Sequence, residues 1–285
     1  EGPAAAVRQL ADMDSVRYVE PDDEAVLDME VSTSVINASR VWSTQIWSGG
    51  RDGGHVTGEG VTCCVVDTGI DAGHPDLDYG EKTLFNMHYD GVNWQELENS
   101  DLSIGHGTHV AGTVAGNGDA SAGARRGVAP DTNLIGLSAG NIETEGNYLK
   151  CLEWVYDNSR PTFNPYNIKL ATNSWHTSVG EYDPQSALTQ VIEKLAFENN
   201  VITTWSMGND GRDDPEGNTI TTSQQGVTPV AVVCAAYEHD GSAAAEFTSR
   251  GKVGWNHTYP DVGAPGVRIW SCSARRTVIS SGTYT

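Results

Sequence analysis

The chain alternates between short apolar segments and longer amphipathic ones. Residues 61–66 form a largely apolar run, which is typical of a strand buried on both faces of a parallel sheet. Further strands are expected at residues 133–137, 168–173, 201–205, 227–235, 260–264 and 268–271, and helices at 148–157 and 186–199. Strands that alternate with helices predict a three-layer, doubly wound α/β fold: a mostly parallel sheet of about seven strands with helices on both faces.

Residues 105–116, which read GHGTHVAGTVAG, predict a helix of small side chains with a histidine in its first turn. Thr108 can cap the N–H groups that have no partner at a helix start. A tightly packed helix that presents His106 at its mouth would hold a general base in place.

Two other interpretations of this segment stay open at this point. His106 and His109 are three residues apart, as zinc ligands on one helix face are. The glutamate of the zinc-peptidase motif is missing between them, and this counts against zinc. Both histidines could also serve only the packing of a glycine-rich turn.

Asp67 follows the first apolar run, and Asn209 follows the expected strand at 201–205. Open parallel sheets keep their sites at the carboxyl ends of strands, so we expect Asp67, His106 and Asn209 along one edge. An acid, a base and an amide donor in this arrangement suit acyl transfer to a serine nucleophile.

The charge of the chain narrows the classes of partner. It carries 38 acidic and 17 basic residues, for a net charge of −21. No basic patch is available for phosphates, so nucleic-acid binding is excluded, and no apolar run is long enough for a membrane span. An acidic, lysine-poor surface suits high salt, because salt screens self-repulsion. We therefore expect a salt-loving source.

Five cysteines occur at a spacing that matches no metal framework, and we expect buried structural roles for most of them. The neighbours Cys63 and Cys64 should point to opposite faces of their strand. The pattern is not that of a disulfide scaffold.

The motifs VVDTGIDAGHPDL, GHGTHVAGTVAG, GVAP, NSW, GNDG and DVGAPG occur in this order from about residue 61 onward. Together they resemble the subtilisin-like serine peptidases, the subtilases. The resemblance implies a secreted endopeptidase that acts on peptide or protein substrates and needs no cofactor for its chemistry. Asp67 would be the triad aspartate, His106 the base and Asn209 the oxyanion-hole residue, while His109 would be a packing residue. We expect a monomer.

The same resemblance divides the chain into residues 1–30, the tail of an inhibitory prodomain, and residues 31–285, a catalytic domain incomplete at its C-terminus. The segment VRYVEPDDEAV is similar to the last strand and tail of such a prodomain. In relatives this tail lies in the substrate groove and is cut, which places the cut between about Asp28 and Ser34. The alternative is that residues 16–19 form an edge strand of the catalytic domain.

The family nucleophile is the serine of a Gly-Thr-Ser motif, and here Gly282 and Thr283 are followed by Tyr284. A phenol is bulky and has a pKa of about 10, so Tyr284 is not expected to be an acyl nucleophile. The chain as printed is expected to be inactive. A fragment with an altered end, a non-catalytic relative, or substitution by Ser281 or Thr283 are the explanations left open.

The resemblance also implies the substrate and metal sites. A peptide backbone would bind between two strand segments by β-augmentation. The segments and the adjoining glycine are Leu137, Ser138, Ala139 and Gly140; Ser174, Trp175 and His176; and Gly208. His176 would narrow or polarise the pocket, although Trp175 and His176 could instead pack under a loop. Asp76 and Asp119 match positions of calcium ligands, which leaves a structural calcium ion open.

The sequence is compatible with three functions. The leading one is a serine endopeptidase, and the second is a peptide-binding relative without catalysis. The third is an α/β ligand-binding domain whose motif set is accidental.

Overall fold

The computed structural model describes residues 28–43, 55–140, 144–255 and 259–275. Its helices are α2 (Asp28–Val35), α3 (Ala38–Ser43), α4 (His106–Ala115), α5 (Glu145–Asn158) and α6 (Ala187–Asn199), with a 3₁₀ turn, η1, at Asp119–Ser121. Its strands are β1 (Thr62–Asp67), β2 (Thr83–Tyr89), β3 (Trp94–Glu96), β4 (Asn133–Ser138), β5 (Ile168–Asn173), β6 (Ile202–Ser206), β7 (Val232–Tyr237) and β8 (Val262–Pro265).

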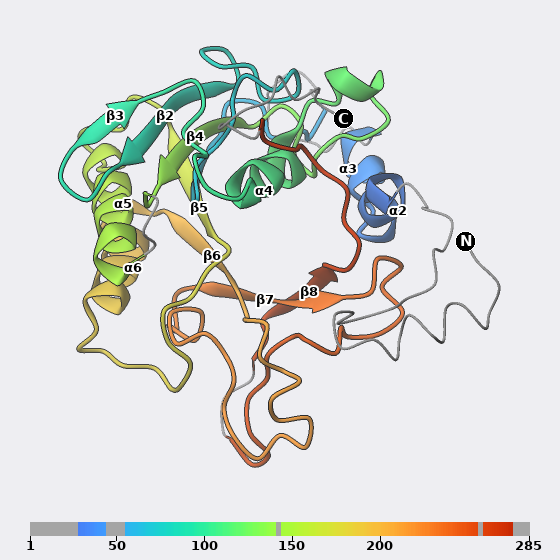
Figure 1. Ribbon diagram of the computed structural model, residues 1–285, viewed down its shortest axis with the longest axis vertical. Helices are drawn as coiled ribbons and strands as arrows, with labels where there is room; N and C mark the ends of the chain where they lie inside the picture. The colour runs from blue at the N-terminus through green and yellow to red at the C-terminus, as the bar shows by residue number, and fades with distance from the viewer. Residues whose placement is uncertain (1–27, 44–54, 141–143, 256–258, 276–285) are drawn as a thin grey trace, which may run out of the picture.

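These eight strands form one sheet in the order β3-β2-β4-β1-β5-β6-β7-β8. Neighbours run parallel except for β3, which pairs antiparallel with β2. Helix α4 lies on one face of the sheet, and α5 and α6 lie on the other (Figure 1). The three-layer, mostly parallel α/β fold is therefore confirmed, with one strand more than the seven expected.

Strand β1 shows how the two faces of the sheet are filled. All six of its residues are buried. Cys63 and Val65 pack with Ala111 of α4, whereas Cys64 and Val66 belong to the core under α5 and α6. The opposite orientation of the two cysteines is the one that strand alternation predicts. A fully buried valine side chain contributes about 1.5–3 kcal/mol, so both faces hold β1 in the centre of the sheet.

One expected strand is absent from the described residues, and two strands were not expected. The strand expected at residues 268–271 is absent from the described part of the chain, because this segment bonds to α4 rather than to the sheet. Ile269 O accepts from His109 Nε2 at 2.8 Å, and Ser271 Oγ donates to His109 O at 2.8 Å. Strands β2 and β3 were not predicted, since their partly buried residues lack a simple alternation.

The expected prodomain tail falls mostly outside the described residues, which begin at residue 28. Within them, the segment expected to contain the cut is the helix α2, Asp28–Val35. A peptide added to a sheet edge must be extended, so this helix would have to unwind before the groove could accept it.

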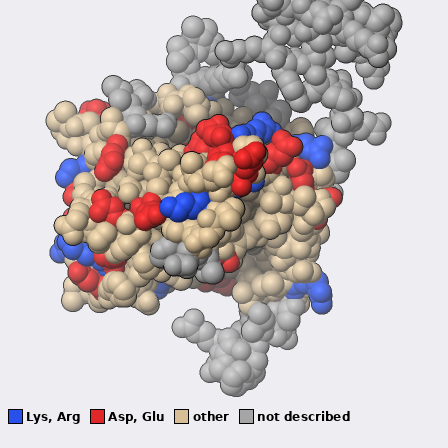
Figure 2. Space-filling model, turned by 90° about the horizontal axis from the view of Figure 1, so that it is seen from below, with Lys and Arg blue, Asp and Glu red and all other residues tan. Residues whose placement is uncertain are grey.

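The surface carries more acidic than basic side chains, as the net charge of −21 requires. On the face drawn in Figure 2, patches of Asp and Glu are interspersed with fewer Lys and Arg among uncharged residues. Within the described ranges, none of the helices is both long and apolar enough for a membrane crossing.

Candidate active site

Asp67 and His106 are brought together at the carboxyl end of β1. Asp67 is the last residue of β1 and His106 the first of α4. His106 Nδ1 lies 2.7 Å from Asp67 Oδ1. The Asp67 carboxylate is 2% exposed and is shielded from solvent, whereas the His106 imidazole is 42% exposed and is accessible from solvent. A hydrogen bond of this length to a carboxylate fixes the ring and stabilises its protonated form.

The start of α4 is held by a buried polar network. Asp101 Oδ1 accepts from Gly105 N and Thr68 Oγ1, both at 3.1 Å, and Oδ2 accepts from Thr108 N at 3.1 Å and Thr108 Oγ1 at 2.7 Å. Thr68 Oγ1 in turn accepts from Gly107 N at 2.8 Å. These bonds satisfy N–H groups at the helix start, and a carboxylate there is favoured by the helix dipole.

Thr108 was expected to cap the start of the helix, and the structure shows a different role for it. The residue lies within α4, and the N-cap is Gly105, which has a φ of 83° and makes no side-chain cap. Thr108 Oγ1 instead accepts from Asp71 N at 2.9 Å while it donates to Asp101. Thr68 and Asp101 were not predicted from the sequence as residues of the site. An aspartate just before a glycine-rich helix is a start signal that could have indicated Asp101.

Gly107 is required where α4 meets the turn after β1. A Cβ atom at this position would lie 2.2 Å from Gly69 O and 3.0 Å from Asp67 Cβ. Only glycine lets the helix approach this closely, and the approach brings His106 within reach of Asp67.

The two histidines of α4 have different partners. His109 Nε2 donates to Ile269 O, and His106 bonds to Asp67. Their rings therefore do not converge on one ion, and the zinc interpretation of this pair has no support in the structure.

Asn209 follows the carboxyl end of β6, two strands away from β1 in the sheet, and its side chain is exposed. The turn before it is tightly held. Gly208 has a φ of +104°, and its carbonyl accepts from Ser249 N at 3.0 Å, while Ser249 Oγ accepts from Asp210 N at 3.0 Å. Because parallel strands share a carboxyl edge, Asn209 lies on the same edge as Asp67. Tyr284, Ser281 and Thr283 lie outside the described residues.

The expected peptide-binding segment at Leu137, Ser138 and Ala139 is corrected by the structure. All three residues are completely buried. Strand β4 lies between β2 and β1, so neither edge of this strand is open to a peptide. Ser138 Oγ donates to Thr68 O at 2.8 Å and thereby supports the turn after Asp67. Gly140, with a φ of +88°, ends this buried stretch.

The second expected segment, Ser174, Trp175 and His176, is not an edge strand either, because β5 ends at Asn173 and lies between β1 and β6. Trp175 is a core residue. It is buried, its Nε1 donates to Val66 O at 2.9 Å, and its ring stacks on Tyr148 with centroids 3.8 Å apart.

His176 differs from its neighbour because it is only partly buried and faces the turn after β6. Its Nε2 lies 3.3 Å from Asp210 Oδ2. A Cβ atom on Gly208 would be 3.5 Å from its ring. His176 and Gly208 therefore do lie side by side next to Asn209.

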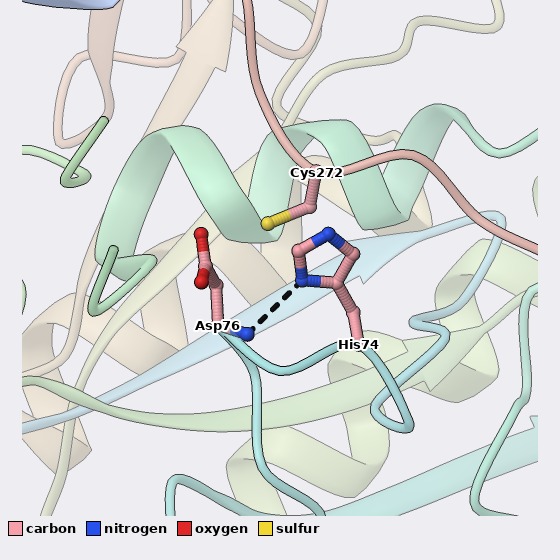
Figure 3. A group of neighbouring side chains, drawn as sticks. All are labelled: His74, Asp76 and Cys272. Atoms are coloured by element: carbon pink, nitrogen blue, oxygen red, sulfur yellow. Dashed lines mark hydrogen bonds between the residues drawn. The ribbon is translucent and has the colours of Figure 1, made fainter. Parts of the chain in front are cut away.

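The two residues expected to bind calcium, Asp76 and Asp119, each accept a hydrogen bond from the protein, and Asp76 belongs to a cluster with mixed donor atoms. Asp76 Oδ1 accepts from Ala120 N at 2.7 Å, and the neighbouring groups are the imidazole of His74 and the thiol of Cys272 (Figure 3). The Asp119 carboxylate instead accepts from Asn117 Nδ2 at 3.1 Å. Calcium takes six to eight oxygen ligands, whereas the cluster that includes Asp76 also contains a nitrogen and a sulfur donor.

Burial keeps the groups around Asp76 in their uncharged forms. It raises the pKa of the Cys272 thiol far above its usual value, with a further contribution from the Asp76 carboxylate. It also lowers the pKa of His74, although the nearby aspartates oppose this effect. The five cysteines are all free thiols, and four are buried.

Comparison with known proteins shows the family to which the chain belongs. The family model of the subtilases matches residues 58–285. The chain is similar to the serine protease AprX of Bacillus subtilis (strain 168), with 31% identity over 97% of this chain and 60% of AprX. It is also similar to subtilisin E of the same organism, with 29% identity over 98% of this chain and 62% of subtilisin E. The chain thus spans about three fifths of the length of these relatives.

Solved structures show the same fold at lower identity. Sphericase aligns with a TM-score of 0.61 and 22% identity, covering 87% of this chain and 76% of its own. The S41 psychrophilic protease aligns with a TM-score of 0.60 and 22% identity, covering 83% and 74%. With the family model matching more than three quarters of the residues, the chain belongs to the subtilase family of serine peptidases.

Proposed function

We propose that this domain is built for serine endopeptidase chemistry, with His106 as the general base and Asp67 as the residue that orients it. The observation that carries the proposal is the 2.7 Å contact between His106 Nδ1 and the buried Asp67 carboxylate, in a subtilase fold. A base whose ring is fixed by a buried carboxylate is the central requirement of hydroxyl activation.

In the proposed reaction, a nucleophilic hydroxyl attacks the peptide carbonyl and gives its proton to His106. Asp67 stabilises the imidazolium that forms, and the Asn209 amide donates to the developing oxyanion. His106 then protonates the leaving amine, and water hydrolyses the acyl-enzyme by the same route. An amide donor in this role is worth about 3–4 kcal/mol in peptidases of this kind.

The nucleophile is the point at which this sequence departs from its family. Tyr284 stands where the motif has serine, so we propose that the chain as printed does not form an acyl-enzyme. The same tyrosine supports the second candidate function, a subtilase that binds peptides without cleaving them.

Labelling by a fluorophosphonate tests both parts of the proposal, because the reagent modifies only an activated hydroxyl. We expect no label on the printed chain, label on the Tyr284→Ser variant, and none on Tyr284→Ser with His106→Ala. Circular dichroism controls for folding. Labelling of the printed chain would contradict the role given to Tyr284. Equal labelling of the two variants would contradict the role of His106.

We further propose that residues 1–30 act as an inhibitory prodomain of a secreted, monomeric enzyme. A synthetic peptide of these residues should inhibit hydrolysis by the Tyr284→Ser variant. Tight binding of this peptide to the printed chain, together with a Tyr284→Ser variant that cleaves no peptide, would favour the second candidate function, peptide binding without cleavage.

A further inference from the structure

A second cluster of reactive side chains packs against α4 and has no role in the proposed chemistry. His74 and Asp76 come from the loop after β1, and Cys272 comes from the segment that follows β8 (Figure 3). They are 2%, 5% and 5% exposed. One possible ligand atom of each lies within 4.8 Å of those of the other two.

The donor set matches a particular class of metal. Imidazole nitrogen, carboxylate oxygen and cysteine sulfur are together the ligands that zinc accepts, whereas calcium takes oxygen. Zinc bond lengths of about 2.0–2.3 Å place tetrahedral ligand atoms about 3.3–3.8 Å apart. The cluster is therefore within a short side-chain movement of this geometry.

A small cavity adjoins the three side chains. It has a volume of about 40 Å³ and is also lined by Ser121, Arg125 and Ser271. This is room for a water molecule, which needs about 10–15 Å³ of such volume. A zinc ion with three protein ligands completes its tetrahedral shell with one water.

The surroundings hold each side chain in position. Asp76 Oδ1 is fixed by the N–H of Ala120, and Cys272 Sγ packs so closely on α4 that a Cβ atom at Gly112 would lie 2.5 Å from it. His74 Nδ1 accepts from Asp76 N at 3.0 Å. Coordination through this nitrogen would replace that hydrogen bond.

We propose that His74, Asp76 and Cys272 bind one zinc ion, with water as the fourth ligand. The Cys272 thiol binds as a thiolate and releases one proton to solvent, so that Zn²⁺ is balanced by the two negative charges of thiolate and carboxylate. Arg125, whose guanidinium lies 5.1 Å from the centre of the Trp270 ring, borders the cavity without being a ligand. The ion would join the loop after β1 to the segment at Cys272.

Metal binding to the whole printed chain tests the proposal. After dialysis against a chelator, we expect one Zn²⁺ bound per chain in competition with a chromophoric chelator, and no displacement by calcium. Cys272→Ala should weaken binding by more than about 100-fold, since loss of even an outer partner of a ligand costs about 10–100-fold. Cys234→Ala is the matched control, because Cys234 is another free cysteine outside the cluster, and it should bind like the parent.

Co²⁺ provides a readout that does not depend on the variants. Bound at this site, it should give the near-ultraviolet charge-transfer absorption of a thiolate ligand and visible bands of tetrahedral cobalt. This spectrum of the unaltered chain decides the question if Cys272→Ala fails to fold. Absence of zinc binding, binding that Cys272→Ala leaves unchanged, or a cobalt spectrum without thiolate absorption would each overturn the proposal.

Discussion

At the scale of single residues, the candidate active site depends on how Asp67 is surrounded. Oδ1 accepts from Thr68 N at 2.8 Å and meets His106 Nδ1, while Oδ2 is buried without a hydrogen-bond partner among the described residues. A buried carboxylate with so few donors gains most from a positive partner. The side chain therefore favours the protonated imidazole that the proposed reaction forms.

Replacing Asp67 by asparagine tests this dependence. In the Tyr284→Ser background, Asp67→Asn should lower kcat by about 10⁴-fold with little change in KM, because the amide fixes the wrong tautomer of the histidine. Asp213→Asn, at an exposed carboxylate, is the control and should leave kcat unchanged. Steady-state hydrolysis of a chromogenic peptide measures both. A loss of less than tenfold would mean that Asp67 does not act through His106.

The contact between Asp67 and His106 could be predicted from sequence because Asp67 ends a strand and His106 begins a helix, and both elements have a strong sequence pattern. The role of Trp175 could not. It follows a strand end directly, yet its ring turns back into the core against Tyr148. Residue type alone does not say whether a loop tryptophan faces substrate or core. Likewise, Cys272 and His74 are far apart in sequence, and only the folded chain brings them together.

At the scale of elements, the segment after β8 is attached to the loop after β1 by an ion pair. Asp71 is completely buried and receives bonds from Arg275 N at 2.7 Å, Nε at 3.0 Å and Nη2 at 2.7 Å. The two residues are 204 positions apart, so no local pattern could predict the pair. Removing one partner of a buried pair leaves a charge without compensation.

Because the Arg275 side chain is 35% exposed and its backbone N–H remains bonded to Asp71, Arg275→Gln should lower the free energy of unfolding by about 1.5–3 kcal/mol. The double variant Arg275→Gln with Asp71→Asn removes the uncompensated charge and should recover at least half of this loss. Urea denaturation followed by fluorescence measures all three chains. If the double variant were no more stable than Arg275→Gln, the cost would not arise from the buried carboxylate.

Strand β1 gives a second prediction at this scale, on alkaline stability. Burial raises the pKa of Cys63 from 9.0 to about 12. The folded state thus keeps a proton that the unfolded chain loses above pH 9. The contribution of the protonated Cys63 thiol to the free energy of unfolding is complete below pH 9. It is lost as the pH rises toward 12, by up to about 1.4 kcal/mol per pH unit.

Denaturation between pH 8 and 11 should show this decline, and Cys63→Ala should reduce its slope. Cys234→Ala should reduce it less, because Cys234 is only partly buried and the same effect on its pKa is smaller. Equal slopes for the parent and Cys63→Ala would contradict the assignment.

At the scale of the whole molecule, the net charge determines how we expect stability to change with salt concentration. A net charge of −21 on 285 residues opposes compaction, and salt screens it. The subtilase fold itself, an eight-stranded sheet between helices, was predictable because its motifs and alternating elements agree. The long-range pairs that complete it were not, for they depend on the tertiary arrangement.

Molar KCl should raise the Tm by at least about 5 °C over dilute buffer, which at about 2–4 °C per kcal/mol corresponds to roughly 1–3 kcal/mol. A variant with Glu59→Gln, Asp213→Asn and Glu216→Gln, three exposed acidic positions, should gain less from salt. Scanning calorimetry measures both chains. A Tm that stayed flat with salt would rule out self-repulsion as a factor in stability.

The proposed chemistry depends on the bond between Asp67 and His106, and proton NMR observes the proton in this bond. We expect one ring N–H resonance far downfield of the amide protons in the printed chain, at low temperature and mildly acidic pH. It should disappear in His106→Gln and in Asp67→Asn. A spectrum without such a resonance, or one that Asp67→Asn leaves unchanged, would show that Asp67 does not hold His106 in this way.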